Sequence, residues 1–227
     1  MYLQFLRYSS IYSLVAASTF SNLRSFSASK MAMSSVKISL IQLKSSSEKK
    51  ENILHAKEMI AKAVRENSSN IIVLPECWNS PYSTASFPVY AEEIPEPGQC
   101  VDEIIHPSTK MLCDAAKMHE VYIIGGSFPE REGDKLFNSC VAINPEGEIV
   151  GKHRKIHLFD IDVPGKMTFK ESDSLSPGNS LTTISSPWGM IGIGICYDLR
   201  FPELALLYRQ MGWYLKPSLL AELKCPN

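Results

Sequence analysis

Cys196 lies where the pattern of the sequence changes from a strand to a helix. Residues 190–195 alternate bulky apolar residues with glycine, which indicates a buried strand that another segment approaches closely on one side. Pro202 and Glu203 then open an amphipathic helix. A thiol at such a corner is exposed at the end of a sheet, where backbone N–H groups favour a thiolate. Cys196 is therefore a candidate nucleophile, and the alternative is a small apolar residue that ends a strand.

Two charged residues are expected at the ends of other strands. Residues 70–74 predict a buried strand that Pro75 stops, so Glu76 lies at the sheet edge where catalytic groups of open α/β folds gather. Lys155 follows a predicted hairpin at residues 140–150. Taken singly, Glu76 is explained as a solvated strand end and Lys155 as part of a basic surface run. A carboxylate, an ammonium and a thiol at three strand ends together predict a nucleophilic site.

Three motifs occur in order along the chain: LPE at residues 74–76, HRKIHLFD at residues 153–160 and GICYDLRFPE at residues 194–203. With these motifs, residues 36–212 resemble the carbon–nitrogen hydrolases of the nitrilase superfamily. The resemblance implies a glutamate–lysine–cysteine triad at Glu76, Lys155 and Cys196. It implies no cofactor.

Three shorter stretches are most similar to the ω-amidase branch of that superfamily: residues 78–82, 87–91 and 160–166. Enzymes of that branch hydrolyse the terminal amide of 2-oxoglutaramate and 2-oxosuccinamate to the 2-oxo acid and ammonia. The resemblance therefore implies a small-molecule amide as substrate. A nitrilase or an N-carbamoyl amide hydrolase with the same triad is the nearest alternative.

The implied triad is consistent with amide hydrolysis by a thiol. This reaction needs a thiolate, a proton for the departing ammonia and an activated water that releases the acyl group. Glu76 is suited to transfer these protons. Lys155, as a cation, is expected to lower the thiol pKa and to stabilise the oxyanion, together with the backbone N–H of Tyr197.

Three further residues are candidates for the same site. The family carries a second glutamate near the triad, which corresponds to Glu171, and a loop carboxylate in water is the alternative. Arg200 is the natural partner for the carboxylate that a 2-oxo dicarboxylate monoamide retains. The alternative is that Arg200 pairs with Asp198 or Glu203. Tyr82 is expected to offer its hydroxyl to the substrate.

The chain alternates strand and helix patterns, with hairpins in its second half. Strands are expected at residues 36–43, 70–74 and 121–127, helices at 48–67 and 104–119, and hairpins at 136–152 and 181–195. Residues 80–98 and the segment from 153 to 180 are expected to be loops. The mixture predicts an α/β fold with helices outside a mixed sheet. The resemblance implies a four-layer α-β-β-α sandwich, with subunits paired as a homodimer through outer helices.

The composition is that of a globular protein and excludes several classes. The chain is 44% hydrophobic and 21% charged, and a net charge of −1 predicts no nucleic-acid or membrane-surface role. No apolar run is long enough to span a bilayer. The six cysteines contain no CxxC pair and the five histidines show no ligand spacing, so neither a disulfide framework nor a metal is predicted. GGS at residues 125–127 is expected to be a turn.

Residues 1–33 have the composition of an organellar transit peptide. No acid occurs before Glu48, and the stretch is rich in serine, leucine and aromatic residues. RSFS at residues 24–27 resembles a mitochondrial processing site. Mitochondrial targeting is therefore predicted, with chloroplast targeting as the alternative. Translation from Met31 or Met33 would give a cytosolic form.

Residues 34–212 are expected to be the N-terminal two-thirds of a hydrolase domain, and residues 213–227 a divergent tail. Family members continue beyond the helix that follows the cysteine, whereas the resemblance stops near Gly212. An incomplete two-sheet sandwich leaves apolar faces and sheet edges uncovered. Two hypotheses follow: an active cysteine amidase, or a catalytically silent fragment that only pairs with a full-length subunit.

Overall fold

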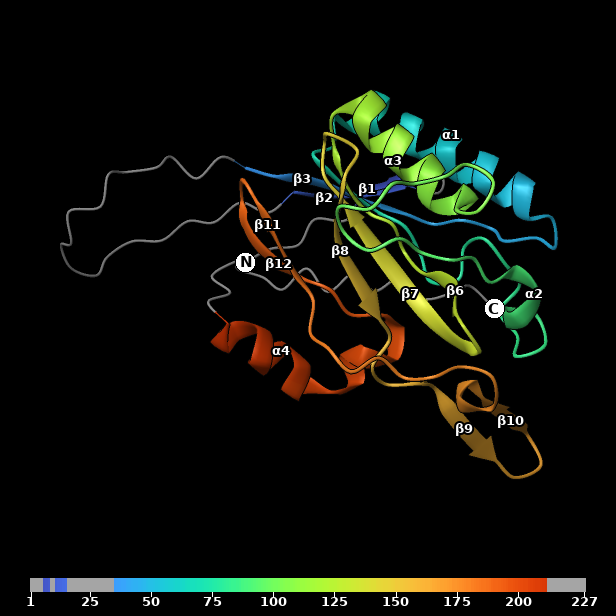
Figure 1. The fold of residues 1–227 in the computed structure, drawn as a ribbon. Helices are drawn as coiled ribbons and strands as arrows, with labels where there is room; N and C mark the ends of the chain where they lie inside the picture. Colours follow the sequence, from blue (N-terminus) through green and yellow to red (C-terminus); the bar gives the residue numbers. More distant parts are fainter. Residues whose placement is uncertain (1–5, 9–10, 16–34, 212–227) are drawn as a thin grey trace, which may run out of the picture.

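One mixed sheet forms the centre of the computed structural model, which describes residues 6–8, 11–15 and 35–211 (Figure 1). The strands of this eight-stranded sheet follow the order β1-β2-β3-β4-β5-β7-β6, and β8 pairs with β7. β4 is parallel to β3 and to β5, and the other neighbours are antiparallel. The bounds are β1 (Leu6–Tyr8), β2 (Ile11–Val15), β3 (Lys37–Ile41), β4 (Ile71–Val73), β5 (Tyr122–Ile124), β6 (Phe128–Glu132), β7 (Lys135–Ile143) and β8 (Ile149–Arg154).

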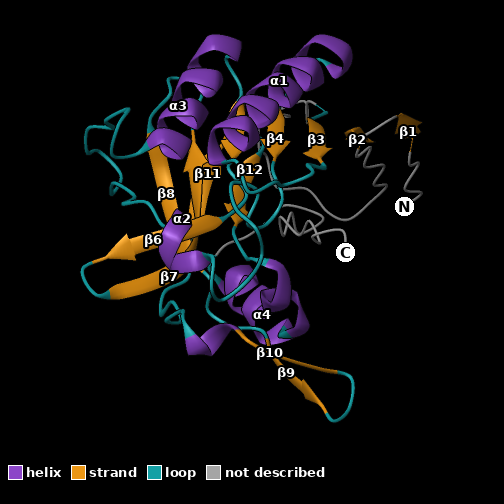
Figure 2. Ribbon diagram, turned by 90° about the vertical axis from the view of Figure 1, so that its right-hand side faces the viewer, coloured by secondary structure: helices purple, strands orange, loops and turns teal. Residues whose placement is uncertain are grey.

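Two long helices, α1 (Lys49–Asn67) and α3 (Pro107–His119), cover one face of this sheet (Figure 2). The helix α3 begins at a proline, whose missing N–H costs nothing in a first turn. On α1 the buried apolar side chains recur at the spacing of one helix face: Ala56, Met59, Ile60 and Ala63. These side chains and those of α3 form one apolar cluster with buried residues of β4 and β5.

A hairpin of β11 (Thr183–Ser186) and β12 (Gly189–Gly192) covers the opposite face of the sheet. Ile184 and Ile191 of the hairpin join one apolar cluster with β3, β4, β5 and β7. Gly151 on β8 allows this close approach, since a Cβ there would lie 2.8 Å from the Cγ2 atom of Ile184.

The helix α4 (Pro202–Gln210) packs on the outer side of the hairpin. Its buried residues are Leu204 and Tyr208, one turn apart. A Cβ at Gly192 would lie 2.9 Å from the ring of Tyr208, so the glycine pattern of this strand does make room for a neighbouring segment. Leu207 lies three residues after Leu204, a spacing that predicts packing beside Leu204 and Tyr208, but it is 45% exposed.

The layers thus follow the order helices, sheet, hairpin and helix, which confirms the α/β fold and the α-β-β-α order (Figures 1 and 2). Within the described residues the second sheet consists of β11 and β12. None of the helices in this part of the chain has the length and hydropathy of a membrane span.

Several short elements lie in segments predicted to be loops. They are α2 (Phe87–Tyr90), β9 (Asp160–Val163), β10 (Met167–Lys170) and the 3₁₀ helix η1 (Glu171–Asp173). β9 and β10 pair as a hairpin that projects from the body of the molecule (Figure 1). All residues of these two strands are exposed or half-buried, so they carry no apolar alternation that marks a strand in sequence.

β1 and β2 lie within the segment predicted as a transit peptide. β2 is antiparallel to β3. The rest of that segment, and the predicted tail, lie outside the described residues.

Candidate active site

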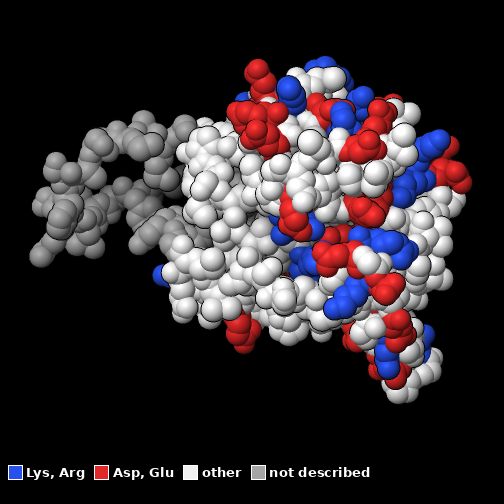
Figure 3. All heavy atoms as spheres, viewed as in Figure 1, with Lys and Arg blue, Asp and Glu red and all other residues white. Residues whose placement is uncertain are grey.

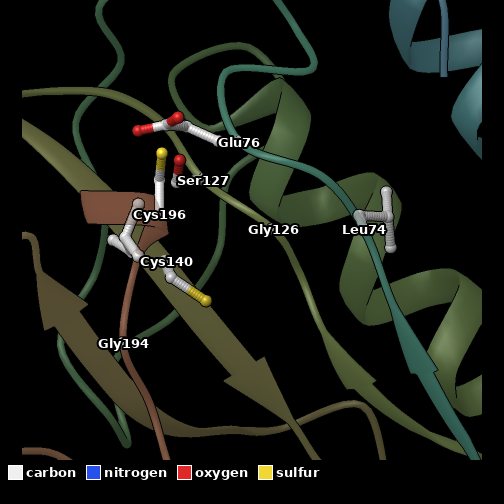
Figure 4. Close-up of a pocket in the computed structure, with 8 residues that line it drawn as sticks. Leu74, Glu76, Gly126, Ser127, Cys140, Gly194 and Cys196 are labelled. Carbon is white, nitrogen blue, oxygen red and sulfur yellow. The ribbon is translucent and has the colours of Figure 1, made fainter. Parts of the chain in front are cut away.

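The three residues of the predicted triad lie close to the ends of three strands. Glu76 follows β4, Lys155 directly follows β8, and Cys196 begins the 3₁₀ helix η2 (Cys196–Arg200) beyond β12. Glu76 and Cys196 line the same small pocket, and Figure 4 shows the carboxylate and the sulfur pointing toward each other. The structure therefore places the carboxylate and the thiol within one site, as the sequence predicts.

Lys155 lies between two carboxylates and is fully buried. Its Nζ atom donates to Oε1 of Glu76 at 2.8 Å and lies 2.9 Å from Oε2 of Glu171. Burial alone would lower the pKa of Lys155, but the charges and hydrogen bonds of the two glutamates outweigh it and raise the pKa above the ordinary lysine value. Lys155 is therefore a permanent ammonium at neutral pH and is suited to oxyanion stabilisation, not to proton abstraction.

Glu76 is held at one oxygen by two donors. Lys155 Nζ and Asn138 Nδ2 both reach Oε1, at 2.8 Å and 2.9 Å. Burial raises the pKa of Glu76, and the charge of Glu171 raises it too, against the opposing effect of Lys155 and of a hydrogen bond with Cys196. A carboxylate with a raised pKa that contacts a thiol is suited to accept and return its proton.

Cys196 sits in a strained turn. Its φ angle is +45°, a conformation that residues with a side chain rarely adopt. The residue is half-buried, so the sulfur can be reached from the pocket. Tyr197 follows Cys196 within the first turn of η2, and its ring packs edge-on against Phe159 and Phe201.

Glu171 belongs to the same cluster and is fully buried, which excludes a loop carboxylate in water. Besides Lys155, it accepts a hydrogen bond at Oε1 from the hydroxyl of Tyr82 at 2.6 Å, and at Oε2 from the backbone N–H of Phe159 at 2.6 Å. The ring of Tyr82 stacks on Phe169 of β10, with centroids 5.3 Å apart. The hydroxyl of Tyr82, expected to face the substrate, is thus engaged with Glu171.

Arg200 lies at the end of η2 and is exposed. It forms no salt bridge with Asp198 or Glu203 in the described part of the chain. Asp198 is buried and accepts hydrogen bonds from other groups. They are the backbone N–H of Ile195 (2.9 Å), the backbone N–H of His157 (2.9 Å), Nδ1 of His157 (2.7 Å) and Nε2 of His153 (3.5 Å).

Sequence reasoning missed three residues of the site: Asn138, Ser127 and Asp198. Ser127 lines the pocket, and its Oγ accepts the backbone N–H of Cys77 at 3.3 Å (Figure 4). The GGS motif by itself predicts only a turn, but it follows a strand, and ligand sites of open α/β sheets gather at the carboxyl ends of strands. No local signal marks Asn138, because its partner Glu76 is 62 residues away.

The described residues contain no group of three side chains with the arrangement of a metal site. The site consists of a thiol, one ammonium and two carboxylates. Such a set is able to perform nucleophilic acyl transfer with its own side chains.

The carbon–nitrogen hydrolase family model matches residues 37–215. The chloroplastic omega-amidase of Arabidopsis thaliana is 52% identical over 178 residues, which are 78% of this chain and 47% of that protein. Omega-amidase NIT2 of Mus musculus is 49% identical over 183 residues, which are 81% of this chain and 62% of that protein.

Among solved structures, Saccharomyces cerevisiae Nit3, a member of branch 10 of the nitrilase superfamily, has a TM-score of 0.68 and 39% sequence identity. The match covers 79% of this chain and 62% of that one. The chain therefore spans between 47% and 62% of the length of these relatives.

Proposed function

This chain belongs to the carbon–nitrogen hydrolase family, and from that premise we propose that it is a cysteine amidase of ω-amidase type. It hydrolyses the terminal amide of 2-oxoglutaramate or 2-oxosuccinamate to the 2-oxo acid and ammonia. The observation that carries the proposal is the buried Lys155, bound between Glu76 and Glu171, with Glu76 in turn hydrogen-bonded to the Cys196 thiol. Two relatives that are about half identical to this chain are named omega-amidases, which supports the choice of branch.

In the acylation step, the Cys196 sulfur attacks the amide carbonyl carbon while Glu76 takes the thiol proton. The oxygen becomes an oxyanion, which the Lys155 ammonium and the Tyr197 N–H stabilise. The C–N bond then breaks, and the nitrogen leaves as ammonia with the proton that Glu76 returns. A thioester between the acyl group and Cys196 remains.

In the deacylation step, Glu76 removes a proton from water, and the resulting hydroxide attacks the thioester carbonyl. The C–S bond breaks, and the proton returns to the sulfur. Glu171 serves both steps by holding Lys155 beside Glu76. The products are a carboxylic acid and the restored thiol, and the acid then loses its proton to the released ammonia or to solvent and becomes a carboxylate.

The substrate is proposed from the chemistry around the pocket. A 2-oxo dicarboxylate monoamide has a second carboxylate that needs a cationic partner. Arg200, four residues after the nucleophile and without a salt bridge to its acidic neighbours in the described chain, is the candidate. Tyr82 contributes through Glu171, on which its hydroxyl is held.

Ammonia release from 2-oxoglutaramate by the purified 227-residue chain tests the activity. Cys196→Ala should abolish the release, and Cys196→Ser should leave almost none because a hydroxyl is far less acidic than a thiol. Arg200→Ala should weaken turnover of carboxylate-bearing amides more than that of neutral amides. Full activity of Cys196→Ala would refute the proposal. An inactive chain that binds a full-length relative would instead support the silent fragment.

Assembly and targeting are separate parts of the proposal. A homodimer through outer helices is supported by exposed apolar side chains such as Leu54 on α1 and Met118 on α3, and sedimentation of the purified chain tests it. Residues 1–33 are proposed as a leader, mitochondrial in preference to chloroplastic, and a reporter fused to residues 1–35 tests this. A chloroplastic relative supports organellar targeting in general. A reporter that stays in the cytosol would contradict it.

A further inference from the structure

Asn138, in the middle of β7, contacts both charged members of the triad. Its backbone carbonyl accepts the backbone N–H of Lys155 at 2.8 Å. Its side-chain Nδ2 donates to Oε1 of Glu76 at 2.9 Å, the oxygen that Lys155 Nζ also reaches. The same residue therefore sets the position of the lysine through its backbone and that of the carboxylate through its side chain.

The amide of Asn138 is poorly suited to a purely structural role. The residue is 1% exposed, and its Oδ1 atom has no hydrogen-bond partner in the structure. An unpaired buried carbonyl oxygen is destabilising, and an apolar side chain of similar volume would avoid that cost. Its neighbours in sequence along β7 are buried, so the position would tolerate such a side chain. The hydrogen bond to Glu76 is the contact that explains the amide.

The charges of the cluster show why a neutral donor is useful here. Two carboxylates, Glu76 and Glu171, share one ammonium, and burial further disfavours the charged form of Glu76. A second lysine would add a charge that has to be buried. An amide N–H stabilises the carboxylate without adding charge, and it fixes the rotation of the carboxyl group about its last bond.

We propose that Asn138 is a positioning residue, which holds Glu76 ionised and oriented as the base for Cys196. The role rests on the proposed function, because it presupposes that Glu76 accepts the thiol proton. In this role Asn138, a residue outside the triad, makes the buried carboxylate of Glu76 a usable base.

The test measures alkylation of Cys196 by iodoacetamide against pH. In this reaction the sulfur–carbon bond forms, iodide leaves and the thiol proton is lost, so the rate reports how readily the proton is removed. The peptide that contains Cys196 is quantified by mass spectrometry, which separates it from the exposed Cys100. Asn138→Leu removes the donor at similar volume, and Asn138→Ala removes it without any risk of a steric clash.

Asn79 offers a matched control. It is also buried, its Nδ2 also donates to a carboxylate, that of Glu92 at 3.2 Å, and its Oδ1 also lacks a partner in the structure. Asn79→Leu therefore removes the same kind of contact from a different carboxylate. Thermal unfolding of each variant shows how much of any effect is a loss of folded protein.

In both Asn138 variants we expect the acid limb of the plot of Cys196 alkylation rate against pH to move up by about one pH unit. The reason is that ionised Glu76 loses a hydrogen bond, which raises the pKa of Glu76. At a pH on that limb the rate should fall about tenfold. The melting temperature of Asn138→Leu should stay within a few degrees of the parent, and Asn79→Leu should leave the profile in place.

An unshifted profile in folded Asn138→Leu or Asn138→Ala would overturn the inference, as would an equal shift in Asn79→Leu. If the unsubstituted chain hydrolyses amides but the pH profile of Cys196 alkylation does not shift in the Asn138 variants, only the role of Asn138 is refuted. If the profile shifts but the parent releases no ammonia, the proposed function alone fails. A parent Cys196 that reacts no faster than Cys100 would overturn both.

Discussion

At the scale of single residues, the protonation state of Lys155 decides which residue of the site acts as the base. Its side chain has no exposure to solvent, and an isolated ammonium in such a place would lose its proton. Glu76 and Glu171 instead raise its pKa, so it remains charged. A lysine that remains protonated is unable to act as a base. The proton transfers therefore fall to Glu76, whose pKa is raised by its burial.

Replacing Lys155 by methionine should lower kcat by about 10²-fold or more with little change in KM, because the lost contact acts on the oxyanion. It should also destabilise the fold by about 3–5 kcal/mol, since two buried carboxylates are left without their cation. Ammonia release and urea unfolding measure the two effects. Lys152→Met is the matched control: Lys152 lies on β8, three residues before Lys155, and its side chain is 8% exposed but pairs with Glu130 and Glu96. A loss of kcat in the control equal to that of Lys155→Met would contradict a specific role.

The hydroxyl of Tyr82 makes a second prediction at this scale. Burial and the nearby charges of Glu76 and Glu171 raise the pKa of Tyr82, so the hydroxyl stays protonated and donates to Glu171. Tyr82→Phe keeps the ring stacked on Phe169 and should lower kcat about tenfold. Tyr90→Phe, which removes an exposed hydroxyl bonded to the carbonyl of Ser47, should leave kcat unchanged. Unchanged kcat in Tyr82→Phe would show that Glu171 needs no such donor.

At the scale of elements, one carboxylate joins the nucleophile turn to the segment after β8. Asp198 lies in η2, and it accepts the N–H of Ile195 just before Cys196 as well as two donors of His157, two residues after Lys155. The ring of His157 in turn stacks on Phe201 at 3.6 Å between centroids. These contacts stabilise the turn against the strain of the positive φ angle at Cys196. They also fix the position of the Cys196 turn relative to the segment that carries Lys155.

Asp198→Asn should therefore weaken both the fold and the site. An amide has one acceptor oxygen, so at least one buried N–H loses its partner, at a cost of about 1–3 kcal/mol. Cys196 alkylation should slow along with ammonia release, because the turn relaxes. Asp160→Asn is the control, since Asp160 also accepts two hydrogen bonds, from Ser172, but is exposed. Equal melting temperatures for the Asp198 and Asp160 variants would contradict this account.

The elements also show what sequence is able to predict. The strands and helices that carry a regular buried stripe, such as α1 and β4, were predicted within a few residues, because burial imposes a period on the sequence. The β9–β10 hairpin was not, because none of its side chains is fully buried and its sequence therefore carries no apolar stripe. The triad residues were predicted from motifs. The contacts that orient them, such as Asn138 to Glu76, join distant parts of the chain and follow only from the fold.

At the scale of the whole molecule, charges of both signs are interspersed over the face that Figure 3 shows, around β6, β7 and β8. Among the charged residues of these three strands, Glu130 of β6 is buried, with 1% exposure. It accepts hydrogen bonds from Arg154 at 2.6 Å and from Lys152 at 2.9 Å. Burial alone would raise the pKa of Glu130, but these donors and Ser139 lower it below the ordinary value.

The lowered pKa of Glu130 gives a pH dependence of stability with a definite sign. Because its pKa is lower in the folded than in the unfolded chain, its contribution is fully present above the ordinary glutamate pKa and is lost as the pH falls through the folded value. Glu130→Gln should lower the free energy of unfolding by about 1–3 kcal/mol at pH 7. It should also reduce the loss of stability between pH 5 and pH 3, as ~pH 4 is where carboxylates titrate. Parallel urea unfolding curves at the two pH values measure this, and an unchanged pH dependence would contradict it.

The last prediction concerns the outer surface of α4. Figure 3 shows few charged side chains over α4 and the β11–β12 hairpin, and Leu206, Leu207 and Met211 are each about half exposed. A large apolar side chain that gains cover contributes roughly 1.5–3 kcal/mol, against about 5–15 kcal/mol for a whole domain. The chain spans 62% of the mouse relative, so that relative contains sequence that this chain does not match.

We expect that joining the following part of the mouse relative after residue 212 raises the melting temperature, reduces aggregation and increases ammonia release per Cys196. Leu207→Lys distinguishes cover of α4 from a general gain in size. In the 227-residue chain it should reduce aggregation, because it adds a charge to an exposed apolar surface. In the extended chain it should instead lower the melting temperature, because the lysine would then be buried. If Leu207→Lys has the same effect in both chains, the added segment does not cover α4. If the 227-residue chain already melts sharply and turns over amide as fast as the extended one, the expectation of an uncovered face is wrong.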